Sequence, residues 1–105
     1  MQDEADQRQA VFERAAELFG LLSTPIRLRI ISELCNAEKN VSQLLESIET
    51  AQSNMSQHLN MLYRAGVLAR RRQGSQIFYR IADESAGLVC RAVCTQVAID
   101  MSDSA

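Results

Sequence analysis

Apolar residues recur every three or four positions through most of this chain, which is the period of an amphipathic α-helix. This period predicts four helices in the first two thirds of the sequence, at about 6–23, 25–35, 41–48 and 52–64. The only proline, Pro25, suits the first turn of the second helix, because its missing N–H is not needed there. One more helix is predicted, from a cap at Asp83 or Ser85 to about residue 101.

One segment departs from the helical period. It follows Gly66, which can end the fourth helix as a left-handed cap, and it contains two β-prone runs at 67–72 and 76–81. A glycine, Gly74, lies between the two runs and is typical of a hairpin turn. The predicted order is therefore ααααββα, a mainly α fold whose strands are confined to this hairpin.

The length of 105 residues leaves room for one small domain, predicted over 1–105 with a core at 6–101 and loose tails at 1–5 and 102–105. A hydrophobic content of 47% suits a globular chain, but a lone domain of this size has a limited core, which dimerisation would extend. No apolar run approaches a membrane span, and the N-terminus is too acidic and polar for a signal peptide. We therefore expect a cytoplasmic protein with no membrane partner, whose three cysteines rest as thiols.

Charge is distributed unevenly along the chain. The window Thr50–Ala82 holds five arginines and one histidine but no carboxylate, although the net charge of the whole protein is -2. Such a window is expected to meet a negatively charged partner. It begins with a polar helix that suits a major groove and ends with an arginine-rich hairpin. This layout predicts a winged helix-turn-helix that binds double-stranded DNA.

The N-terminal end of the fourth helix carries five uncharged polar side chains that we expect to read bases: Gln52, Ser53, Asn54, Ser56 and Gln57. Glutamine and asparagine offer paired donor and acceptor groups that suit adenine, and serine can serve bases or phosphates. The alternative is an ordinary solvated helix face. The absence of lysine and carboxylates, together with residues of low helix propensity, favours the DNA interpretation.

The hairpin supplies four arginines that we expect to neutralise phosphates: Arg70, Arg71, Arg72 and Arg80. Because successive side chains of a strand point to opposite faces, Arg70 and Arg72 share one face and Arg71 lies on the other. The alternative is that charge merely protects an edge strand from aggregation. Glutamate or lysine would serve that purpose equally well, so the exclusion of acidic residues favours DNA.

Several segments together resemble one family. They are LLSTPIRLRIISEL, VSQLLESI, QSNMSQHLNMLYRAGVLARRRQGSQIFYRI and the closing helix, and they cover about residues 16–95. The chain resembles the ArsR/SmtB family of small winged-helix repressors. The resemblance implies a homodimer that releases operator DNA when a small inducer binds. For His58 it implies a phosphate contact or support within the helix.

The inducer sites of that family transfer only where residues match. At the thiol site that enters the third helix, this chain has Asn40 and Ser42 in place of cysteines. At the metal site of the last helix it keeps Asp83 but has no histidine, which zinc sites commonly require. The resemblance therefore implies neither of these metal sites, and no cofactor is expected.

The remaining candidates for sensing are Cys35 at the end of the second helix and Cys90 and Cys94 on one face of the last. A buried cysteine often packs simply as a small hydrophobic residue. One possible chemistry resembles the family's persulfide- and redox-responsive branch, whose first cysteine falls near Ser32, and would link Cys35 to Cys94 or Cys90. The other is a three-thiolate site for trivalent arsenic or another thiophilic ion. We favour the thiol switch, whose inducer is a reactive sulfur species or an oxidant. The inducer of the alternative site is a metalloid.

The sequence bears differently on two further classes of function. A constitutive DNA-binding protein with inert buried cysteines stays open. An enzyme is not expected, because the only histidine lies on the recognition helix and no phosphate-binding loop or catalytic set of side chains is present in the sequence.

Overall fold

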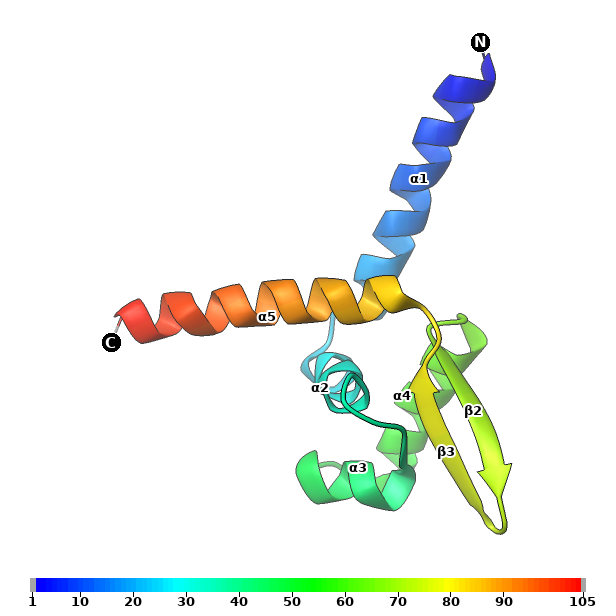
Figure 1. Ribbon diagram of the computed structural model, residues 1–105, viewed down its shortest axis with the longest axis vertical. Coiled ribbons are helices and arrows are strands. Elements are labelled where there is room, and N and C mark those ends of the chain that lie inside the picture. Colours follow the sequence, from blue (N-terminus) through cyan, green and yellow to red (C-terminus); the bar gives the residue numbers. More distant parts are fainter. Residues whose placement is uncertain (1, 105) are drawn as a thin grey trace.

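The computed structural model describes residues 2–104, with side chains from 3 onward. Its elements are α1 (Gln2–Leu21), α2 (Pro25–Leu34), β1 (Lys39–Asn40), α3 (Val41–Ser47), α4 (Gln52–Arg64), β2 (Leu68–Gln73), β3 (Gln76–Ile81) and α5 (Glu84–Ser104), as shown in Figure 1. The predicted order of helices and hairpin is confirmed, with one short strand added.

Local sequence signals account for where the helices begin. Thr24 caps α2, because its side-chain oxygen accepts a hydrogen bond of 3.2 Å from the backbone N–H of Arg27, and Pro25 occupies the first turn. Asn40 and Gln43 form a capping box at α3, in which each side chain accepts a bond of 2.9 Å from the other's backbone N–H. These caps fix the starts of α2 and α3.

The added strand corrects the expectation that strands are confined to the hairpin. Lys39 and Asn40 pair antiparallel with β3, opposite Tyr79 and Phe78, so the sheet order is β1-β3-β2. Two residues are too few to show an alternating pattern, and lysine and asparagine are not β-prone. This pairing joins the hairpin to the loop between α2 and α3.

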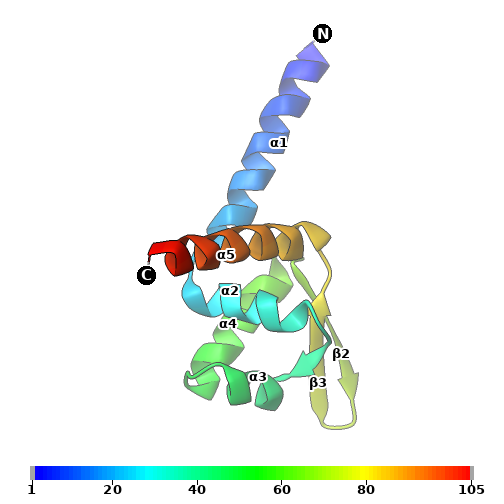
Figure 2. The same cartoon turned by 60° about the vertical axis from the view of Figure 1, so that its left-hand side comes forward.

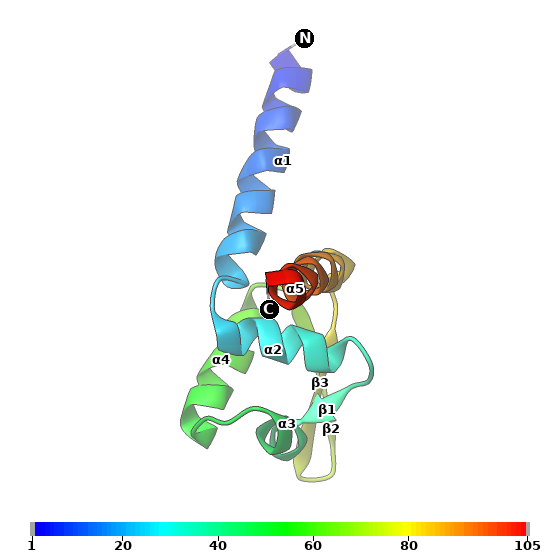
Figure 3. The same cartoon turned by 90° about the vertical axis from the view of Figure 1, so that its left-hand side faces the viewer.

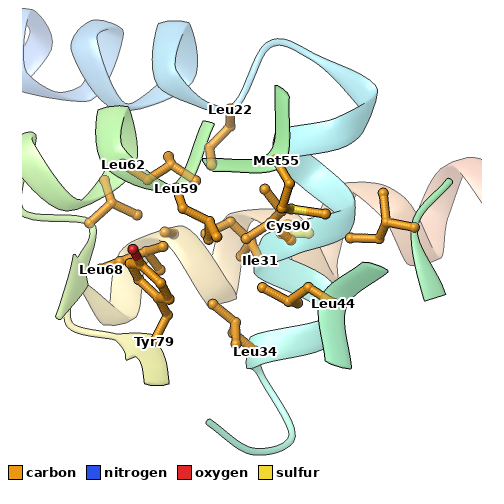
Figure 4. Packing of buried hydrophobic residues seen from close by; sticks show 14 residues of the cluster. Leu22, Ile31, Leu34, Leu44, Met55, Leu59, Leu62, Leu68, Tyr79 and Cys90 are labelled. Atoms are coloured by element: carbon orange, nitrogen blue, oxygen red, sulfur yellow. The ribbon is translucent and has the colours of Figure 1, made fainter. Parts of the chain in front are cut away.

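The core lies where α2, α3, α4, the sheet and the first turns of α5 meet. Figure 4 shows side chains from all of these elements converging, with Cys90 of α5 pointing into the same cluster as Ile31 of α2 and Met55 of α4. Helix α2 passes beneath α5 and packs against it, which Figures 2 and 3 show from two sides. We call this compact part, residues 22–90, the body.

Two helices extend beyond the body. In Figure 1, α1 and the C-terminal part of α5 project away from it in different directions. Every side chain from 3 to 17 and from 91 to 104 is exposed. The prediction of loose tails at 1–5 and 102–105 is wrong for 2–5 and 102–104, which are helical. Residues 1 and 105 lie outside the described residues. None of the helices within 2–104 is both long and apolar enough to cross a membrane.

Candidate nucleic-acid interface and thiol site

Helix α4 separates its apolar and polar side chains onto opposite faces. Met55, Leu59 and Leu62 are buried against the body. Four of the five predicted base-reading residues are exposed together near its N-terminus: Gln52, Ser53, Ser56 and Gln57. Asn54 differs, because it is half-buried and its Nδ2 donates a 2.7 Å hydrogen bond to Thr50 Oγ1. Part of its amide is therefore engaged in holding the turn before α4.

His58 joins α4 to α2, the helix that packs behind it. Its Nδ1 lies 3.3 Å from Nη1 of Arg27 on α2, and the Arg27 Nε donates to the carbonyl oxygen of Leu21. Because a guanidinium can only donate, Nδ1 is the acceptor. Burial and then the charge of Arg27 lower the pKa of His58. Of the two roles implied for His58, this geometry favours support of α4 over a phosphate contact.

The hairpin arginines lie on two faces, as the alternation predicted. Arg70 is opposite Tyr79 and its guanidinium lies 3.9 Å from the centroid of the Tyr63 ring of α4, within range of a cation–π interaction. Arg71 is opposite Phe78 and lies over that ring at 4.9 Å. Within residues 3–104, neither Arg72 nor Arg80 lies within ion-pairing distance of a carboxylate.

Arg71 is engaged by a carboxylate from outside the hairpin. Its guanidinium forms an ion pair with Glu38, with Nε donating to Oε1 at 2.9 Å, and Nη1 donates to Gln73 Oε1 at 2.7 Å. Hydrogen bonding to Arg71 lowers the pKa of Glu38. The window that lacks acidic residues in sequence thus contacts one in space. No local pattern predicts this contact, because Glu38 and Arg71 are 33 positions apart in the sequence.

The three cysteines lie around one small cavity between α2 and α5. This thiol cavity, of about 190 Å³, is lined by Ser32, Cys35, Asn36, Cys90, Arg91, Cys94 and Thr95. Cys90 Sγ is 3.9 Å from Cys94 Sγ and 3.5 Å from the carbonyl oxygen of Leu28. The structure therefore brings together the residues that were predicted as a sensor.

Their accessibilities differ. Cys35 and Cys94 are exposed, whereas Cys90 is buried at 2% exposure. Burial, followed by the hydrogen bond with Cys94, raises the pKa of the Cys90 thiol to about 11. Since the thiolate is the nucleophile, its burial and raised pKa both oppose reaction at Cys90. The expectation of inert buried cysteines fits Cys90 but is wrong about burial for the other two.

The arrangement of the cysteines also limits the alternative of a metalloid site. Among residues 3–104, no three side chains of histidine, cysteine, aspartate or glutamate are grouped so that they could hold a metal ion. A three-thiolate site would therefore require rearrangement of the cysteines.

Gly87 of α5 was not predicted from the sequence as part of the thiol site. A Cβ atom at this position of α5 would lie 3.3 Å from Cys35 Sγ. The sulfur at the end of α2 therefore rests almost directly on the backbone of α5. A glycine within a helical pattern often marks such a close approach, so the signal was present.

A polar helix end and an arginine-bearing hairpin on one helical body define a winged helix-turn-helix. The transcriptional repressor BigR from Xylella fastidiosa has a similar structure, with a TM-score of 0.77 and 30% identity over 90% of this chain and 94% of that one. So has a homodimeric winged helix-turn-helix DNA-binding domain from Mycobacterium bovis, Mb0332, with a TM-score of 0.74 and 25% identity over 95% and 92% of the two chains.

Residues 24–70 match the family described as bacterial regulatory protein, arsR family. A biofilm growth-associated repressor of Xylella fastidiosa is 34% identical over 96 residues, which is 85% of this chain and 84% of that protein. The transcriptional repressor SmtB of Mycobacterium tuberculosis is 34% identical over 73 residues, 70% of this chain but only 54% of that protein, so the match spans about half of the SmtB repressor. The chain belongs to the arsR family of bacterial regulatory proteins.

Proposed function

We propose that this protein is a dimeric, sequence-specific transcriptional repressor that thiol chemistry releases from operator DNA. The observation that carries the DNA-binding part is the exposed polar face at the start of α4, beside a hairpin in which Arg72 and Arg80 make no ion pair within residues 3–104. Similar proteins are named as transcriptional repressors, which supports the same role.

The proposed base-reading face is tested by Gln57→Ala, with Asn60→Ala as the matched control on the same helix. Both side chains are exposed, but Asn60 lies beyond the N-terminal end that enters a groove. Loss of a base contact should cost about 1–3 kcal/mol at particular base pairs. Fluorescence anisotropy with operator and scrambled duplexes measures this. If Gln57→Ala leaves both operator affinity and sequence preference intact, this face of α4 does not read bases.

The hairpin arginines should differ in how much each contributes to DNA affinity and its salt dependence. Arg72→Gln removes a charge without an ion pair, whereas Arg71 is already partly neutralised by Glu38. We therefore expect Arg72→Gln to weaken binding to all sequences and to reduce the salt slope by about one, with a smaller change for Arg71→Gln. Titrations at several salt concentrations give both slopes. Equal slopes for the two variants would contradict this ranking.

A homodimer is proposed because the projecting helices carry exposed apolar side chains. These are Val11, Phe12, Phe19, Val93, Val97, Ile99 and Met101. Apolar surface of this extent is typical of an interaction site. A two-fold partner would cover it and would place two recognition helices about one turn of DNA apart.

The thiol switch is proposed to link Cys35 with Cys94. Both are exposed and line the thiol cavity, whereas Cys90 is buried with a raised pKa, so Cys94 is the favoured partner. A disulfide needs α-carbons about 4.4–6.8 Å apart, and an inserted chain of sulfur atoms spans more. Because α2 packs on α5, and α5 carries the proposed dimer surface, the link would change the separation of the two recognition helices. A coupling of about 1–3 kcal/mol is typical of allosteric release.

Peptide mapping after treatment with polysulfide or hydrogen peroxide tests the switch. We expect a Cys35–Cys94 link within one protomer, weaker DNA binding, and recovery with dithiothreitol. Cys35→Ser should abolish the response, and Cys90→Ser should keep it. Release by arsenite without any such link would favour the metalloid alternative, and no release by any of the three reagents would favour a constitutive DNA-binding protein.

A further inference from the structure

A second cavity, of about 430 Å³, adjoins Cys35 where the end of α2, the end of β3 and the first turns of α5 meet. We call it the arginine cavity, because Arg80 and Arg91 line it together with Glu38 and Glu84. Cys35, Asn36 and Arg91 also line the thiol cavity. The Cys35 thiol therefore lies at the boundary between a larger charged cavity and the one that holds the other two cysteines.

The charges of the arginine cavity favour an anionic ligand. Glu38 is bound by Arg71, which offsets its charge. Within residues 3–104, Arg80, Arg91 and Glu84 make no ion pair. Two guanidinium groups and one unengaged carboxylate thus remain around the thiol. Guanidinium groups bind carboxylates through paired, charge-assisted hydrogen bonds.

Size and access suit a small molecule that reaches the sulfur. The volume lies within the usual range for ligand pockets. Cys35 is exposed, and the absence of a Cβ at Gly87 leaves the backbone of α5 close beside its sulfur. Any other residue at position 87 would crowd the thiol from this side.

We propose that the arginine cavity binds a small disulfide that carries carboxylates, and that this disulfide reacts with Cys35. The Cys35 thiol releases its proton to water, and the thiolate attacks one sulfur of the disulfide. A bond forms between Cys35 Sγ and that sulfur while the original sulfur–sulfur bond breaks. The departing sulfur takes the electron pair and then a proton from water, leaving as a free thiol.

The neighbouring cavity then supplies a second step. Cys94, an exposed thiol of the thiol cavity, loses its proton to water and attacks the Cys35 sulfur of the mixed disulfide. The Cys35–Cys94 bond forms, and the second half of the small disulfide leaves with the electron pair and is protonated by water. This deepens the proposed thiol switch by naming the class of oxidant. The adduct itself can be tested without DNA.

The test measures adduct formation by intact-mass spectrometry on the full chain with Cys94→Ser, so that the first product accumulates. Oxidised glutathione is the carboxylate-bearing probe and bis(2-hydroxyethyl) disulfide the neutral one, each normalised to its rate with free N-acetylcysteine. We expect a normalised preference for oxidised glutathione that falls with added salt. Arg91→Gln or Arg80→Gln should each lower that rate about two- to fivefold and leave the neutral probe unchanged. Arg8→Gln, on the projecting part of α1, is the matched control.

Peptide mapping must place the adduct on Cys35, and Cys35→Ser in the same background must remove it. The proposal is wrong if the two probes react alike after normalisation, if neither arginine variant changes the preference, or if the adduct forms on Cys90. An adduct on Cys35 that leaves DNA binding unchanged would contradict the repressor switch and still support this site. DNA release by oxidised glutathione in the native chain without reaction at Cys35 would overturn this site.

Discussion

The body and the projecting helices are built from similar amphipathic sequence, yet the apolar residues of the body are buried and those of the projecting helices are exposed. In the body, Leu44, Met55 and Leu59 have no exposed surface. On the projecting helices, Phe12 is 70% exposed and Met101 is 68% exposed. The body therefore satisfies its hydrophobic residues within one chain, whereas α1 and the C-terminal part of α5 leave theirs for another surface.

The difference in burial is clearest along α5, because this helix belongs to both regions. Cys90 is buried in the body, and Val97 lies seven residues later on the same side of the helix, yet it is 48% exposed because the body has ended. Helical period fixes which side of a helix is apolar. It does not determine whether that apolar side is buried by the same chain or by a partner.

The largest effect is expected in the body. Leu59→Ala removes a fully buried side chain from α4, which should lower the free energy of unfolding by about 2–5 kcal/mol. Met61→Ala on the same helix is the control, since Met61 is 47% exposed and its loss should cost far less. Urea denaturation at one fixed protein concentration measures both. Equal losses for the two variants would mean that α4 does not pack as described.

A smaller effect is expected from the projecting helices, and it should appear in association. Val97→Glu would place a charge on the surface proposed for the partner and remove burial worth about 1.5–3 kcal/mol. Sedimentation equilibrium should show a weaker dimer, with secondary structure retained by circular dichroism. Ser42→Glu adds the same charge at an exposed position of α3, away from the projecting helices, and should change association less. A native chain that is monomeric at micromolar concentration would refute the dimer itself.

Local pattern predicted most of the body. The helix starts at Pro25 and Val41 follow from capping residues beside them, and the hairpin follows from Gly74 between two β-prone runs. The alternation of the hairpin arginines was confirmed for the same reason, because strand geometry alone dictates it. These features depend on residues that are neighbours in sequence.

The features that the sequence did not predict depend on distant pairings. β1 exists only because Lys39 and Asn40 meet β3, and the engagement of Arg71 depends on Glu38 next to that strand. The close approach of Cys35 to Gly87 depends on how α2 crosses α5. The three cysteines were predicted to converge from their places on two helices, but only the packing of α5 distinguishes buried Cys90 from exposed Cys94.

The smallest effect is expected at His58, where α4 meets α2 within the body. Burial and Arg27 lower its pKa below the unfolded value near 6.5, so the unfolded chain binds the proton more readily than the folded one. Stability should therefore be fully present above about pH 6.5 and fall as the pH drops through that value towards the folded pKa. His58 is the only histidine, so few other side chains titrate between pH 5.5 and 7.5. Melting temperatures across this range should rise with pH in the native chain and stay nearly level in His58→Gln, which can still accept a hydrogen bond from Arg27. If both chains show the same slope, the dependence originates elsewhere and the His58–Arg27 contact does not couple the two helices.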